Sequence, residues 1–283
     1  LAPDRLVYGV TDDEAGERDC AILDEVYSAI LAKDTPRLVM NFATAELVKV
    51  AANSFLATKI SFINAMAEIA DATGANVTQL ADAIGHDDRI GRRFLNAGIG
   101  FGGGCLPKDI RGFAARANEL GVGEALSFLK DVDEINLRRR GRVHEILSAE
   151  LGDLAGKKIA VWGLAFKPDS DDIRDSPALD IVETLARAGA HVTGSDPEAT
   201  GPAARRIESA NLQDSVSLDV DHLAAAEGAD AIVVATEWKH FQTADPAHVA
   251  GLVNNALVVD GRNCLESEAW KKAGFSYRGM GRS

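Results

Sequence analysis

The segment Phe101-Gly-Gly-Gly-Cys-Leu-Pro-Lys-Asp109 combines a reactive side chain, a flexible backbone and the start of a helix. The three glycines before Cys105 carry no Cβ atoms that would keep a ligand away from the main chain. Pro107 is tolerated in a first helical turn, so we expect Cys105 near a helix N-terminus and beside Lys108. These neighbours favour the thiolate, which is the nucleophilic form of cysteine. The segment therefore predicts a nucleophile at Cys105, and the alternative is a buried structural cysteine in a glycine-rich turn.

Length, composition and charge indicate a globular protein with one or two domains. Of the 283 residues, 46% are hydrophobic and 26% are charged. No apolar run reaches the roughly 18 residues of a membrane span, and no signal-peptide pattern opens the chain, so we expect a cytoplasmic location. The formal net charge is −13, whereas nucleic acid and anionic membranes bind clustered basic residues. We therefore expect neither of them as a partner.

The cysteines are few and far apart in the sequence. Cys20, Cys105 and Cys264 form an odd set with neither the pattern of a disulfide framework nor the spacing of metal ligands. We therefore expect free thiols in a reducing compartment and no metal site.

The first 42 residues have the pattern of an incomplete α/β domain. Residues 5–10 and 37–41 are predicted as strands, with a helix over residues 14–31 between them. The chain opens with Leu1-Ala-Pro-Asp4 rather than with methionine. We therefore expect a piece of a longer protein, in which residues 1–42 are the remnant of an N-terminal domain.

Residues 43–152 are predicted as a central helical domain. Its alanine-rich stretches favour close helix packing, which predicts a homodimer through these helices; the alternative is a bundle within one chain. The triplet Arg138-Arg-Arg140 is expected on a solvated helix face. Helices are predicted over residues 44–71, 77–84 with Asn76 as N-cap, 107–120 and 124–151.

Residues 153–283 are predicted as a Rossmann-like, doubly wound α/β domain, so the fold class is α/β. Ligands of such a domain bind beyond the carboxyl ends of the strands, where Lys167 follows the first strand and Arg262 follows the last. A dinucleotide fingerprint needs three glycines, and this loop has only Gly163. We therefore expect Lys167 and Arg262 to hold a nucleotide. Continuous apolar runs predict buried strands over 158–164, 191–196, 229–235 and 256–260, with a helix over 176–188.

Several motifs follow one another along the chain in a specific order and spacing. They are Lys49-Val-Ala-Ala-Asn53, Arg89-Ile-Gly, Phe94-Leu-Asn-Ala-Gly98, Gly100 to Asp109, Gly163-Leu-Ala-Phe-Lys-Pro168 with Asp172, Arg174-Asp-Ser176 and Asp260-Gly-Arg262. In these motifs the chain resembles, over essentially its whole length, one enzyme family, the UDP-glucose/GDP-mannose dehydrogenases. The loop 89–105 is most similar to that of members acting on UDP-glucose, and GDP-mannose or another nucleotide sugar is the alternative substrate. The glycine fingerprint of the family's NAD-binding domain is absent from the sequence, so residues 1–42 resemble the end of that domain.

The resemblance implies an NAD-dependent oxidation, in two steps, of the sugar C6 alcohol of UDP-glucose to the carboxylate of UDP-glucuronate, a product used in polysaccharide biosynthesis. An aldehyde held on Cys105 as a thiohemiacetal gives up a second hydride to become a thioester, which water cleaves. Lys49 and Asn53, four residues apart on a helix, would contact the substrate and stabilise the oxyanion at C6. Asp109 would position or activate water. For Lys49 and Asn53, the alternative is a solvated helix face.

The resemblance also implies the residues that bind substrate and cofactor. Arg89 matches an arginine that reaches the substrate of the neighbouring subunit, so the homodimer would be part of the site. Lys108, Arg174 and Cys105 match positions beside NAD. The nucleotide sugar would be held by the loop Asn96, Ala97, Gly98, Ile99, Gly100, Phe101 and Gly102, and by Phe166, Lys167 and Arg262.

Two further expectations bear on function. Since no domain in these residues presents NAD, we expect the 283-residue chain by itself to bind UDP-glucose weakly and to reduce no NAD. A nucleotide-binding dimeric module without chemistry is the non-enzymatic alternative. Such a module would need the C-terminal domain but not Cys105 beside Lys108 and Asp109.

Overall fold

The computed structural model describes residues 2–282, which form two compact units that divide between Phe55 and Leu56. In the first unit, two parallel strands pair with Leu6 opposite Arg37. The helix predicted over residues 14–31 is broken at Tyr27. The elements are β1 (Leu6–Gly9), α1 (Glu14–Val26), α2 (Ser28–Leu31), β2 (Arg37–Met40) and the start of α3 (Phe42–Thr73).

The second unit begins with packed helices, as the alanine-rich sequence predicts. The side chain of Asn76 accepts hydrogen bonds from the backbone N–H groups of Thr78 and Gln79, which confirms Asn76 as the N-cap of α4. The helix predicted over 124–151 is divided, because a short 3₁₀ turn precedes Ser127. Besides the end of α3, the elements are α4 (Val77–Gly85), α5 (Leu106–Glu119), the 3₁₀ helix η1 (Gly123–Leu126) and α6 (Phe128–Leu151).

A six-stranded parallel sheet follows in the order β5-β4-β3-β6-β7-β8. The predicted strands are confirmed as β3, β4, β6 and β7, whereas the edge strands β5 and β8 were not predicted. The order reverses between β3 and β6, so the carboxyl ends of these two strands mark the crevice where doubly wound sheets bind ligands. The strands are β3 (Lys158–Trp162), β4 (His191–Ser195), β5 (Val216–Asp219), β6 (Ala231–Val234), β7 (Leu257–Asp260) and β8 (Ser276–Gly279).

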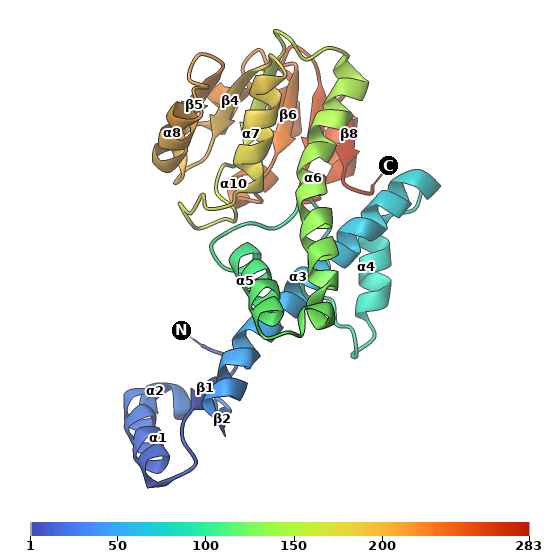
Figure 1. The fold of residues 1–283 in the computed structure, drawn as a ribbon. Helices are drawn as coiled ribbons and strands as arrows, with labels where there is room; N and C mark the ends of the chain where they lie inside the picture. Colours follow the sequence, from blue (N-terminus) through green and yellow to red (C-terminus); the bar gives the residue numbers. More distant parts are fainter. Residues whose placement is uncertain (1, 283) are drawn as a thin grey trace. The chain divides into compact units, whose positions relative to one another are not determined.

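Helices cover both faces of this sheet. One hydrophobic cluster joins residues such as Ile159 and Val161 of β3 to α6, α7 and α8, and a second joins Trp162 to α9 through α12. Helix α6 packs Val143 and Leu147 into the first cluster, and it runs from the neighbourhood of α5 to the sheet (Figure 1). The remaining helices are α7 (Pro177–Arg187), α8 (Thr200–Ser209), α9 (His222–Ala226), α10 (Lys239–Gln242), α11 (Pro246–Ala250) and α12 (Ser267–Lys272).

Across residues 2–282, the length and apolar character of the helices do not suffice for any of them to cross a membrane.

Candidate active site

Cys105 occupies the position immediately before α5, with Pro107 in the first helical turn, as the sequence predicts. Its thiol is exposed. The Nζ atom of Lys108 lies 2.6 Å from Oδ1 of Asp109, and this hydrogen bond raises the pKa of Lys108 above its ordinary value. Lys108 therefore stays positive at neutral pH close to Cys105, where the N-terminus of α5 also favours negative charge.

The glycines before Cys105 make room for protein groups. A Cβ at Gly102 would lie 2.1 Å from the carbonyl oxygen of Asp175. Gly103 has a φ of +85°, and a Cβ there would lie 2.7 Å from the ring of Phe166. At Gly104 a Cβ would lie 2.4 Å from Cζ of Arg174. Asp175, Phe166 and Arg174 thus lie against residues 100–104, the glycine loop, where the sequence also predicts the approach of a ligand.

Arg174 lies beside Cys105 through this contact with Gly104. Its guanidinium donates to both carboxylate oxygens of Asp172, with Nη2 to Oδ2 at 2.6 Å and Nε to Oδ1 at 2.9 Å. These hydrogen bonds raise the pKa of Arg174 and lower that of Asp172. The carbonyl of Arg174 accepts a hydrogen bond from the N–H of Gly103 at 2.8 Å. A cation with 72% of its side chain exposed is thereby fixed next to the cysteine.

A cavity of about 370 Å³ lies in the second unit beside the glycine loop. Lys167 and Phe166 both line this cavity, and the ammonium group of Lys167 lies 5.4 Å from the centre of the Phe166 ring. Leu106, the residue after Cys105, is also in the wall, so the cavity reaches the start of α5. The wall brings together Ile60, Asn64, Phe94, Asn96, Gly98, Gly100, Phe101, Gly102, Leu106, Phe166, Lys167, Glu237 and Arg262.

Arg262 connects two strand ends to the glycine loop. Its Nε donates to the carbonyl of Ala235 and its Nη1 donates to the carbonyl of Gly100, both at 2.8 Å. Nε also lies 3.5 Å from a carboxylate oxygen of Glu237. Nη2 is buried and has no hydrogen-bond partner among residues 2–282. Arg262 therefore holds the loop, and its buried Nη2 is left without a partner in a residue that lines the cavity.

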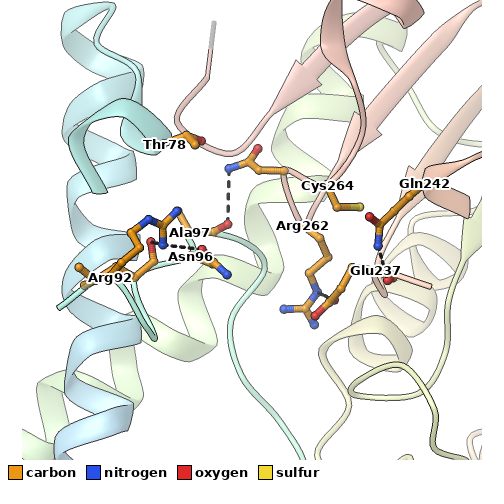
Figure 2. Close-up of a pocket in the computed structure, with 10 residues that line it drawn as sticks. Thr78, Arg92, Asn96, Ala97, Glu237, Gln242, Arg262 and Cys264 are labelled. Atoms are coloured by element: carbon orange, nitrogen blue, oxygen red, sulfur yellow. Dashed lines mark hydrogen bonds and ion pairs between the residues drawn. The ribbon is translucent and has the colours of Figure 1, made fainter. Parts of the chain in front are cut away.

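A second cavity of about 290 Å³ shares Asn96, Glu237 and Arg262 with the first. Figure 2 shows Arg92 and Asn96 on one side of it, and Gln242 and Cys264 on the other. Nη1 of Arg92 donates to the side-chain oxygen of Asn96 at 2.7 Å. The two cavities thus meet at Arg262.

Other predicted site residues lie away from the larger cavity. Ala97 is in the wall of the second cavity. Ile99 is fully buried in the core, and its N–H donates to the carbonyl of Gly261 at 3.0 Å. Arg89 is 87% exposed and pairs with Asp87 at 2.6 Å, which raises the pKa of Arg89.

Lys49 and Asn53 belong to the first unit, on the part of α3 before Phe55. Nζ of Lys49 lies 3.4 Å from the side-chain oxygen of Asn53. This contact confirms that the two side chains share one helical face.

The expectation of a solvated face at Arg138-Arg-Arg140 is wrong for two of the three arginines. Arg138 is exposed and paired with Glu68, but Arg139 is 1% exposed and Arg140 is 7% exposed. Nε of Arg139 donates to the carbonyl of Gly98 at 3.2 Å, and burial lowers the pKa of Arg139. The two arginines continue the buried face that includes Leu129, Val132, Asn136 and Val143, a three-to-four-residue spacing that could have identified them.

Comparisons with known proteins match the chain over two ranges, the first of which begins in the first unit. Residues 43–138 match the central domain of the UDP-glucose/GDP-mannose dehydrogenase family, and residues 160–267 match its UDP binding domain. A UDP-glucose 6-dehydrogenase of Rickettsia typhi is 40% identical over 282 residues, which are 99% of this chain and 63% of that protein. One from Pseudomonas aeruginosa is 39% identical over 285 residues, covering 99% of this chain and 61% of that protein.

The solved structures agree with the sequence relatives. The structure of a UDP-glucose dehydrogenase from Pyrobaculum islandicum superposes with a TM-score of 0.85 at 35% identity, covering 100% of this chain and 60% of that one. The chain thus spans about three fifths of the length of the relatives that it matches.

Proposed function

Because the chain belongs to the UDP-glucose/GDP-mannose dehydrogenase family, we propose that it supplies the nucleophile and the substrate cavity of an NAD-dependent dehydrogenase acting on UDP-glucose. One observation carries this proposal: the exposed Cys105 precedes Leu106 in the wall of a cavity that also presents Lys167 and Arg262. The names of the relatives support UDP-glucose as the substrate.

The cavity suits a nucleotide diphosphate joined to a sugar. Lys167 provides a cation and Arg262 provides an unpartnered donor, and both types of group bind diphosphate oxygens. They follow β3 and β7, beyond the carboxyl ends of the strands, where this fold binds nucleotides. The sugar would then extend along the glycine loop toward Cys105, with Asn96 to Gly102 lying beside the nucleotide sugar.

The chemistry proposed for Cys105 has three steps. The thiolate adds to the C6 aldehyde, which forms the C–S bond of a thiohemiacetal. Loss of a hydride from C6 converts this adduct to a thioester. Water then attacks the thioester carbonyl, which releases the carboxylate and returns the thiol. NAD, when bound, accepts the hydride in each of the two oxidations.

The residues around Cys105 fit this cofactor. Lys108 and Arg174 are 73% and 72% exposed, and both stand at the cysteine as cations that suit cofactor phosphates. In the proposed mechanism, Asp109 positions the hydrolytic water. Lys49 and Asn53 stabilise the negative oxygen at C6 with an ammonium and an amide donor.

We propose further that two copies of the chain associate through α3. Phe62 and Ile69 are 49% and 58% exposed, and they stand seven residues apart, so they form an apolar stripe on one side of the helix. In such a dimer, Arg89 would contribute to the partner's site. Sedimentation at micromolar concentration tests the dimer, and a purely monomeric chain would contradict it.

Calorimetric titration of the chain, followed by mass spectrometry of iodoacetamide-treated peptides, tests the function. We expect UDP-glucose to bind and to slow alkylation of Cys105, with Arg262→Gln as the variant that weakens both effects. If the chain binds GDP-mannose more tightly than UDP-glucose, GDP-mannose becomes the proposed substrate. If it binds neither nucleotide sugar, the proposed nucleotide-sugar site is refuted. Binding without protection of Cys105 would favour the module without chemistry.

A further inference from the structure

Helix α6 holds the glycine loop from behind with polar side chains. Asn136 is fully buried, accepts a hydrogen bond from the N–H of Phe101 at 2.7 Å and donates one to its carbonyl at 3.0 Å. Nη2 of Arg140 donates to the same carbonyl at 3.2 Å. Because these residues lie four apart on one helical face, α6 satisfies both backbone groups of Phe101.

Arg140 also pairs with Asp175 and Asp180, and Asp175 contacts the glycine loop at Gly102. Its Nη2 lies 2.9 Å from Oδ1 of Asp175, and its Nη1 pairs with Asp180. Asp175 has a φ of +49°, an uncommon backbone conformation for a residue with a side chain. Arg111 donates to the other carboxylate oxygen of Asp175 at 3.1 Å. Two arginines thus hold the carboxylate of Asp175, whose backbone has this uncommon conformation.

Asp175 adjoins the residues that shape the surroundings of Cys105. Its carbonyl meets Gly102 so closely that no Cβ would fit. The backbone carbonyl of the preceding residue, Arg174, accepts a hydrogen bond from the N–H of Gly103, and the guanidinium of Arg174 lies against Gly104. One guanidinium therefore links both sides of the loop that leads to Cys105.

We propose that Arg140 is a positioning residue, which fixes the glycine loop against Asp175 and so sets the places of Cys105 and Arg174. The inference deepens the proposed function and rests on it. Arg140 acts through the planar fork of its guanidinium, which reaches Phe101, Asp175 and Asp180 together. A lysine ammonium at this position is a compact charge that cannot reproduce the fork.

The test compares Arg140→Lys with Arg140→Met, and uses Arg138→Lys on the same helix as the matched control, since Arg138 is exposed. For each chain, we would measure the thermal midpoint, the rate of Cys105 alkylation and the Kd for UDP-glucose. Arg140→Lys should recover the thermal midpoint that Arg140→Met loses, because it restores the buried charge. It should still slow alkylation and weaken binding, each by about tenfold, the effect of losing a hydrogen bond to a charged group.

Arg138→Lys should match the unmodified chain in all three measurements. If Arg140→Lys alkylates and binds like the unmodified chain, Arg140 only compensates charge and the proposal is wrong. If neither Arg140 variant folds, Asp175→Asn decides, because asparagine has nearly the same shape as aspartate. Slower alkylation of Cys105 than in the unmodified chain supports the proposal, and an unchanged rate overturns it. If the unmodified chain binds no UDP-glucose, the proposed function fails, but the alkylation rates still decide the role of Arg140.

Discussion

Replacing Gly102 with alanine should displace the glycine loop. The added Cβ would lie 2.1 Å from the carbonyl oxygen of Asp175 and 2.7 Å from Cδ of Pro177. Since nonbonded heavy atoms prefer about 3.5 Å, the loop or its neighbour must move by roughly 1 Å. Neither obstacle is the end of a flexible side chain, because one is backbone and the other is a proline ring at the start of α7. Overpacking of this kind costs about 1–3 kcal/mol in the free energy of unfolding.

The functional cost of Gly102→Ala should exceed its cost in stability. A 1 Å misplacement of reacting groups can lower a rate on the order of 100-fold, so kcat/KM of a full-length protein containing this chain should fall by about that factor. Guanidinium unfolding and steady-state NADH formation measure the two effects. Gly112→Ala is the control, because its Cβ meets open space in α5 and alanine should stabilise that helix by about 0.5–1 kcal/mol. If Gly102→Ala unfolds and turns over like Gly112→Ala, the close contact with Asp175 does not restrain the loop.

Three other predictions concern Cys20 and Cys264, two partly buried histidines, and the 283-residue chain by itself. Cys20→Ser and Cys264→Ser should leave turnover nearly unchanged, and loss of activity in either variant would mean that the site includes residues not assigned to it. Iodoacetamide should leave Cys264 unmodified, because burial raises the pKa of its thiol. Burial lowers the pKa of His222 and of His240, so as pH falls below about 6.5 the unfolded chain takes up protons that the folded chain does not. Stability measured by urea unfolding should therefore decline from pH 6.5 to 5, and His222→Gln should flatten the decline; an unchanged slope would contradict the assignment. The 283-residue chain alone should bind UDP-glucose and form no NADH, as followed at 340 nm, and NADH formation would reveal a cofactor site elsewhere in these residues.

The local features of the site could be predicted from the sequence because they depend on residues close along the chain. The placement of Cys105 before a helix follows from Pro107 and the preceding glycines. The buried strands of the sheet could be predicted from their continuous apolar runs. The edge strands β5 and β8 could not, because Val-Ser-Leu-Asp and Ser-Tyr-Arg-Gly lack such a run.

The partners of the glycines could not be predicted, since they come from distant segments. Local sequence shows that Gly102 lacks a side chain, but only the fold shows that Asp175 fills the space. The partners of the buried arginines of α6 could not be predicted for the same reason, although their spacing along the helix indicated that these arginines are buried. Charge alone predicts a solvated face, whereas Arg139 and Arg140 find loop carbonyls and carboxylates that make their burial tolerable.

In the proposed mechanism, Cys105 carries the substrate covalently between the two oxidations. Its most direct test is the Cys105→Ser variant of a full-length protein containing this chain, assayed for UDP-glucuronate by chromatography and for UDP-glucose binding by calorimetry. A hydroxyl in place of the thiol should leave binding nearly intact and abolish net formation of the acid. Formation of UDP-glucuronate at the normal rate by Cys105→Ser would contradict the covalent mechanism.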